Sequence, residues 1–187
     1  EVYLPPFQAA MEEGVATLMP SFQETAGLPS TANPWLLRQV LRQDWGFEGV
    51  VISDYGAIEE LTKHRICQDK LEAGKLALSL GVDIDMMSDI YRTLPPTPDL
   101  QASLDRSVLR LLALKKALGL FEDPYRFFNP EREKKTQFCQ DFRLASCRAA
   151  EKSAVLLENR QQLLPLEPQR YKRVSVIGPL ADDAVST

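Results

Sequence analysis

Residues 49–56 are Gly49-Val50-Val51-Ile52-Ser53-Asp54-Tyr55-Gly56, an apolar run that ends abruptly in polar residues. Continuous apolar runs are typical of strands that are covered on both faces of a parallel sheet. In (β/α)₈ enzymes the carboxyl ends of such strands form the active-site face. Asp54 is therefore a candidate catalytic carboxylate. The pattern equally allows the alternative that Asp54 only caps a following helix.

The dipeptide Gly-Val begins an apolar run three times, at residues 14, 49 and 81. A strand, a helix and their turns need about the number of residues that separates these positions, so the repeat predicts three successive βα units. The first and third strands would then add Phe22, Met86 and Ser88 to the rim that holds Asp54. Apolar and hydroxyl groups around one carboxylate suit a sugar pocket, whereas the structural alternative is core Met and solvated Ser.

Helices are predicted between the strands. Asn33 is a suitable N-cap and is followed by Pro34, which is favoured at the first helical position. Asp69 with Glu72 resembles a capping box for a helix that ends at Gly81. A last helix is expected between Thr97-Pro98 and Gly119, with apolar residues near one face. Both a doubly wound sheet and a (β/α)₈ barrel are built from such units.

The character of the chain changes after residue 120. We expect residues 1–128 to form one domain, residues 129–172 to form a linker with a helix over 141–152, and residues 173–187 to begin a second domain with a strand over 174–177. A barrel needs roughly 250 residues, so if this chain belongs to a barrel, only its last part is present. The chain begins with Glu and shows no signal peptide, which fits either a processed chain or an internal piece of a longer protein.

Composition excludes several classes of function. The net charge is −4 and no Lys/Arg cluster is present, which argues against a nucleic-acid-binding protein. No apolar stretch approaches the roughly 18 residues of a membrane span. His64 is the single histidine, so a histidine-based metal site is not expected. Asp83 and Asp85 share one face of a strand, and we expect structural support or ion pairing from them rather than acid–base chemistry or metal binding.

Two longer stretches carry a resemblance to a known family. They are Asn33-Pro34-Trp35-Leu36-Leu37 and the residues from Leu41-Arg42 through Trp45-Gly46-Phe47 to Ser53-Asp54. They resemble glycoside hydrolase family 3, whose pattern is N-x-x-L-L followed by L-R-x-x-W-G-F-x-G-x-V-x-S-D. Gly119–Tyr125 matches the exit of the family's first domain, and Val155–Asn159 and Ile177-Gly178-Pro179 match the entry to its second.

The resemblance implies a fold and an activity. The fold would be the C-terminal portion of a (β/α)₈ TIM-like barrel, a linker, and the first strand of an α/β sandwich domain. The activity would be retaining hydrolysis of terminal β-D-glucosyl, or β-xylosyl, residues by double displacement. Asp54 would be the nucleophile and Tyr55 would line the sugar-binding mouth. Neither a metal nor an organic cofactor is implied, and the compartment would be the periplasm or the cell exterior.

The sequence departs from the family pattern in instructive places. The family's acid/base Glu comes from the second domain, so we expect it outside this chain. Phe22-Gln23 stands where many members have Tyr-Asn. The chain by itself is therefore expected to be incomplete and inactive. A catalytically inactive carbohydrate-binding or scaffold protein on the same fold is the alternative, and a doubly wound nucleotide-binding protein would need a Gly-rich phosphate loop that is not present.

Overall fold

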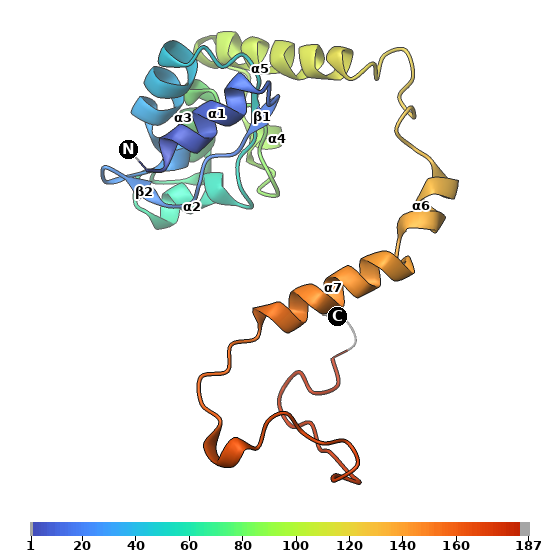
Figure 1. Cartoon of the computed structure of the whole chain (residues 1–187). Helices are drawn as coiled ribbons and strands as arrows, with labels where there is room; N and C mark the ends of the chain where they lie inside the picture. The colour runs from blue at the N-terminus through green and yellow to red at the C-terminus, as the bar shows by residue number, and fades with distance from the viewer. Residues whose placement is uncertain (1, 184–187) are drawn as a thin grey trace. The chain divides into compact units, whose positions relative to one another are not determined.

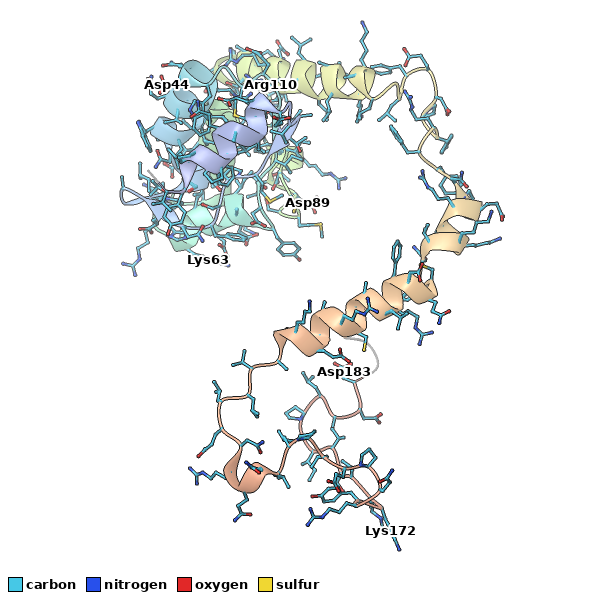
Figure 2. All side chains as sticks on the ribbon, viewed as in Figure 1. Asp44, Lys63, Asp89, Arg110, Lys172 and Asp183 are labelled. Carbon is cyan, nitrogen blue, oxygen red and sulfur yellow. The ribbon has the colours of Figure 1, made fainter. Side chains whose placement is uncertain are left out.

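The computed structural model describes residues 2–183 and divides into two compact units, Glu1–Phe128 (unit 1) and Asn129–Thr187 (unit 2). Unit 1 contains the strands, most of the helices and all the residues that are buried in the described part of the chain. Side chains are crowded in unit 1 and stand apart along most of unit 2 (Figure 2). The two units are therefore described separately.

Three parallel segments form the centre of unit 1, as the repeat predicts. Strand β1 (Thr17–Leu18; Figure 1) pairs in parallel with strand β4 (Val50–Val51), and a parallel bridge joins Ile52 to Ile84. The segment around β4 is thus central, and β1 and residues 82–86 lie on its two sides. Val50 and Val51 are fully buried, which agrees with an apolar run that is covered on both faces.

Helices follow each parallel segment, with local signals at their ends. The Asn33 carboxamide oxygen accepts the N–H groups of Trp35 and Leu36, and the Asp69 carboxylate accepts that of Glu72. Gly81 ends its helix in the left-handed conformation. These features confirm the predicted caps. The helices of this group are η2 (Trp35–Asp44, a π-helix), α2 (Ala57–Lys63), α3 (Lys70–Leu80), α4 (Ile90–Thr93) and α5 (Pro98–Ala117).

Other elements of unit 1 were not expected from the sequence. Helix α1 (Leu4–Glu12) has Pro at its start and no buried residue, so it has no strong apolar periodicity to reveal it. Strands β2 (Glu24–Thr25) and β3 (Leu28–Pro29) form a short antiparallel hairpin, and the 3₁₀ turn η1 (Ser30–Ala32) follows at once. These segments are only two or three residues long, which is too short for periodicity to predict.

The residues of α5 that are buried are not those of the apolar face predicted from the sequence. Leu104 and Val108 remain more than two-fifths exposed, whereas Leu100, Ser103 and Ser107 are buried. Ser107 lies inside because it hydrogen-bonds a buried carboxylate from the neighbouring strand segment. Polar partners, rather than apolar periodicity alone, thus select the inner face of this helix.

Unit 2 is built of short helices and irregular chain. The helix expected over 141–152 is present as α7 (Gln140–Ser153), preceded by α6 (Pro130–Thr136) and followed by the 3₁₀ turn η3 (Arg160–Gln162). The strand expected over 174–177 is not formed, because within the described residues this segment has no partner strand to complete its hydrogen bonds. None of the described helices is long and apolar enough to cross a membrane.

Candidate active site

Asp54 lies where the central parallel segment ends. Val50 and Val51 form β4, Ile52 makes the bridge to the neighbouring segment, and Ser53 is fully buried. The chain then emerges, since Asp54 is half-buried and Tyr55 is 65% exposed. A buried strand therefore delivers one carboxylate and one aromatic ring to the surface at its carboxyl end.

The Asp54 side chain does not cap the helix that follows. The N-cap position of α2 is Gly56, which has a left-handed φ of 65°. Asp54 Oδ1 instead accepts the N–H of Tyr55 at 2.6 Å, and only its carbonyl oxygen reaches α2, by accepting the N–H of Ala57 at 3.1 Å. Among the described residues no ion pair involves Asp54. The capping alternative is thus excluded, and the second carboxylate oxygen accepts no hydrogen bond from the described residues.

Backbone hydrogen bonds bring Met86 to the same strand end. Its N–H donates to Ser53 Oγ at 2.8 Å, and its carbonyl oxygen accepts the N–H of Gly56 at 2.9 Å. Met86 is half-buried, whereas Met87 is 71% exposed with a left-handed φ of 66°. The expected neighbours Asp54, Tyr55 and Met86 therefore do share one rim.

Ser88 and Asp85 form a separate polar cluster on this rim. The Ser88 hydroxyl donates to Asp85, whose carboxylate also accepts the N–H groups of Ile90 and Tyr91 at 2.7 and 3.3 Å. Asp85 thereby caps α4, which agrees with the structural role expected for it. The Ser88 hydroxyl is half-buried and is engaged in this cap.

Phe22 lies on the loop between β1 and β2 and is 43% exposed. No hydrogen bond or ring contact joins it to Asp54 or Tyr55 in the part of the chain that the structure describes. A cleft of about 670 Å³ lies beside this loop, lined mainly by apolar residues that include Met19 and Trp35, but Asp54 is not among its lining residues. Asp54, which is half-buried, is therefore not part of this cleft.

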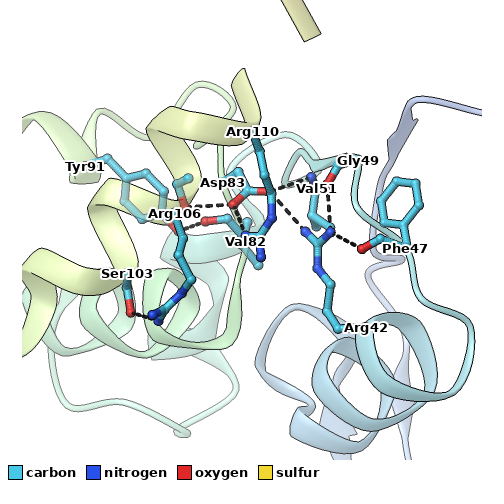
Figure 3. Close-up of polar contacts among 11 residues, drawn as sticks. Arg42, Phe47, Gly49, Val51, Val82, Asp83, Tyr91, Ser103, Arg106 and Arg110 are labelled. Atoms are coloured by element: carbon cyan, nitrogen blue, oxygen red, sulfur yellow. Dashed lines mark hydrogen bonds and ion pairs between the residues drawn. The ribbon is translucent and has the colours of Figure 1, made fainter. Parts of the chain in front are cut away.

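A buried ionic network supports the strands beneath this rim (Figure 3). The side chain of Asp83 is fully buried and pairs with Arg42 at 3.1 Å and Arg110 at 2.9 Å. It also accepts hydrogen bonds from the Val51 N–H and the Ser107 hydroxyl, at 2.9 and 2.7 Å. Burial and the nearby Arg110 lower the pKa of Arg42. The expectation that Asp83 has a structural role is confirmed.

Metal ligation has no visible basis in this rim. Within the described residues no group of three or more His, Cys, Asp or Glu side chains could hold a metal ion. His64 lies outside the rim, with Nδ1 3.0 Å from Glu24 Oε1 of the β2–β3 hairpin. The rim therefore presents the half-buried Asp54 carboxylate with the exposed Tyr55 ring beside it in sequence.

Comparison with known proteins decides the family. The model of the glycosyl hydrolase family 3 N-terminal domain matches residues 1–113. The chain belongs to glycosyl hydrolase family 3. A periplasmic β-glucosidase of Salmonella typhimurium is 37% identical over 96% of the chain, and a β-xylosidase of Formosa agariphila is 37% identical over 98%. The chain spans about a quarter of these family 3 proteins, 24% and 27% of their respective lengths.

Solved family 3 structures agree with the fold. A β-glucosidase from Listeria innocua matches with a TM-score of 0.69 and 39% identity, over 87% of this chain and 23% of that one. A family 3 exo-β-xylosidase, solved with a xylobiose aziridine probe, matches with a TM-score of 0.64 and 27% identity, over 89% of this chain and 22% of that one. An α/β domain of the TIM-like kind is therefore consistent with unit 1.

Two supporting features of the site were not found from the sequence. Ser53 lies directly before the expected nucleophile and Arg42 belongs to the matched stretch, but the sequence does not indicate which atoms their side chains bind. For Ser53 the signal was a polar residue directly after an apolar run, because a hydroxyl that is buried there requires a hydrogen-bonding partner. That signal indicates a buried hydroxyl but not which atoms it contacts.

Proposed function

We propose that this chain is the nucleophile-bearing part of a retaining β-glycosidase that acts on terminal β-D-glucosyl or β-xylosyl residues. The observation that carries the proposal is the position of Asp54, a half-buried carboxylate at the carboxyl end of the central parallel strand in a family 3 chain. The alternative of a cap is removed by the geometry of α2. β-Glucosidases and β-xylosidases among the relatives support this substrate class.

The proposed mechanism is a double displacement. Asp54 attacks the anomeric carbon and forms a glycosyl ester while a second carboxyl group protonates the departing oxygen. The second group then activates water, which cleaves the ester and restores the β configuration. Retaining enzymes hold the two carboxyl groups about 5–5.5 Å apart. We infer that the acid/base Glu lies outside this chain and that Tyr55, Phe22, Met86 and Ser88 line the sugar site.

The architecture proposed for the whole protein follows from the same reasoning. Residues 1–128 would be the last three βα units of a (β/α)₈ barrel, residues 129–172 a linker, and residues 173–187 the start of an α/β sandwich domain. Three barrel units leave strand edges unpaired, so the isolated chain is proposed to be inactive. A periplasmic or secreted location is proposed from the Salmonella relative.

Substitution of Asp54 in the complete protein that carries this chain tests the proposal. Asp54→Asn is expected to lower hydrolysis of an aryl β-glucoside on the order of 10⁴-fold, because a neutral carboxamide replaces the nucleophilic carboxylate. In Asp54→Gly, added azide is expected to restore turnover and to give an α-glycosyl azide. The azide ion would occupy the space left by the carboxylate and attack the anomeric carbon from that face. An Asp54→Asn protein that retains sugar binding while the wild type shows no hydrolysis supports the inactive carbohydrate-binding alternative.

A further inference from the structure

The hydroxyl of Ser53 is held between two strand ends. Ser53 is fully buried, its Oγ donates to the Asp54 carbonyl oxygen at 3.0 Å, and it accepts the Met86 N–H at 2.8 Å. The Met86 nitrogen can only donate and the Asp54 carbonyl can only accept. The hydroxyl proton must therefore point at Asp54, because a hydroxyl has a single donor.

The backbone on both sides of Asp54 is tied to the same neighbouring segment. The Ser53 N–H donates to the Ile84 carbonyl oxygen at 2.9 Å, and the Gly56 N–H donates to the Met86 carbonyl oxygen at 2.9 Å. Asp54 and Tyr55 are the residues between these two anchors. The Ser53 hydroxyl adds a bond to the Asp54 carbonyl itself, so it restrains the peptide group next to the reacting side chain.

The Asp54 carboxylate has little else to orient it. Its hydrogen bond to the adjacent Tyr55 N–H moves with the same short segment of backbone, and no ion pair holds it among the described residues. The direction of the carboxylate therefore depends on the backbone. A nucleophile needs its target at about 3–3.5 Å, and a misplacement of about 1 Å can cost roughly 10²-fold in rate.

We propose that Ser53 is the positioning residue of the nucleophile, holding Asp54 in line for attack by linking its carbonyl oxygen to the Met86 N–H. This inference rests on the proposed role of Asp54. Ser53 does not touch substrate, so its removal should slow the glycosylation step and leave ground-state binding nearly unchanged. A residue that only stabilises the fold would instead change the number of active molecules and not the rate of each.

The test compares Ser53→Thr with Ser53→Val in the complete protein, since these side chains have nearly the same shape and differ by the hydroxyl. Active sites are counted from the end point of aryl release with a glycoside whose glycosyl ester does not turn over, because this end point does not depend on how fast the ester forms, and kcat is expressed per counted site. We expect Ser53→Val to lower kcat about 10- to 100-fold with KM within about threefold, and Ser53→Thr to stay near the wild type. Ser103→Ala, which removes another buried hydroxyl, on α5, is the matched control with unchanged kcat.

The remaining outcomes are also decisive. Equal kcat per site in Ser53→Val and Ser53→Thr overturns the proposal, as does a loss of Ser53→Val activity that follows only the number of counted sites. Where the larger side chains prevent folding, Ser53→Ala replaces them, and wild-type kcat per site in that variant also overturns the proposal. Asp54→Asn is measured in parallel: if it retains full activity the proposed function fails, whereas an inactive Asp54→Asn beside a fully active Ser53→Val refutes the role of Ser53 alone.

Discussion

Asp83 binds Val51 twice, because its backbone N–H donates to the Val51 carbonyl oxygen at 2.7 Å and its carboxylate accepts the Val51 N–H at 2.9 Å. The Asp83 carboxylate thus accepts a backbone N–H of the central strand that would otherwise be bound by a backbone carbonyl group. The same carboxylate faces Arg42 from η2 and Arg110 from α5. One buried charge therefore joins two helices to the strand that ends in Asp54.

Removal of this charge should be costly. Asp83→Asn leaves Arg42 and Arg110, whose side chains are 15% and 21% exposed, without a counter-charge. We expect the free energy of unfolding to fall by about 3 kcal/mol, because breaking a buried pair leaves uncompensated charge. Chemical denaturation of the complete protein measures this. Asp89→Asn, which breaks an exposed pair with Arg92, is the control and should change stability by about 0.5 kcal/mol or less; equal effects of the two variants would contradict the prediction.

Asn33 has two separable roles. Its carboxamide oxygen caps η2, and its Nδ2 donates to the Thr25 carbonyl oxygen of the hairpin at 2.9 Å. Asn33→Ala should lose about 1–2 kcal/mol of stability. Asn33→Asp retains the capping oxygen, but it loses the hairpin donor and places a buried carboxylate against the Thr25 carbonyl oxygen, so it should also be destabilising. Thermal unfolding of both variants measures these losses, and a variant as stable as the wild type would contradict the role assigned to the group that it lacks.

Tyr91 should make stability fall at alkaline pH. Burial, with the charges of Asp85 and Asp83, raises the pKa of Tyr91 well above its usual 10.0. Above about pH 10 the folded protein therefore retains a Tyr91 proton that the unfolded chain loses. The contribution of Tyr91 to the free energy of unfolding is intact below about pH 10, and it is lost as the pH rises from there toward the pKa of Tyr91 in the folded protein. Tyr91→Phe should remove this fall of stability with pH.

The variant should also lose about 1 kcal/mol of stability at neutral pH, because the hydrogen bond to the Val82 carbonyl oxygen at 2.7 Å is gone. Denaturation curves across alkaline pH give both values, and an unchanged slope in Tyr91→Phe would refute the assignment.

Cys67 should report the integrity of unit 1. It is 5% exposed, and burial, followed by the charges of Glu72 and Asp69, raises the pKa of its thiol. Alkylation at mildly alkaline pH should be at least about tenfold slower in the folded protein than in concentrated urea, because the thiolate is the reactive form. Peptide mass spectrometry after iodoacetamide treatment measures the modification at Cys67 directly. Equal rates with and without urea would mean that the packing around Cys67 opens readily.

The sequence by itself determined the features that depend on neighbouring residues. The apolar run before Ser53 predicted a buried strand, and Asn33, Asp69 and Gly81 predicted helix ends, because caps and turns are satisfied by atoms a few residues away. The position of Asp54 at the end of a strand followed from the same pattern. The sequence also separated Asp83 and Asp85 from the catalytic candidates, although without naming their partners.

Only the tertiary structure decided the contacts between distant segments. Ser53 and Met86 are 33 residues apart, and Arg42 and Asp83 are 41 apart, so no local pattern relates them. The same holds for the inner face of α5, where Ser107 is buried by its bond to Asp83. The segment over 174–177 shows the converse, because β-propensity alone does not form a strand without a partner. A buried polar atom must find a hydrogen-bonding partner, but the chain's path through space determines which one it finds.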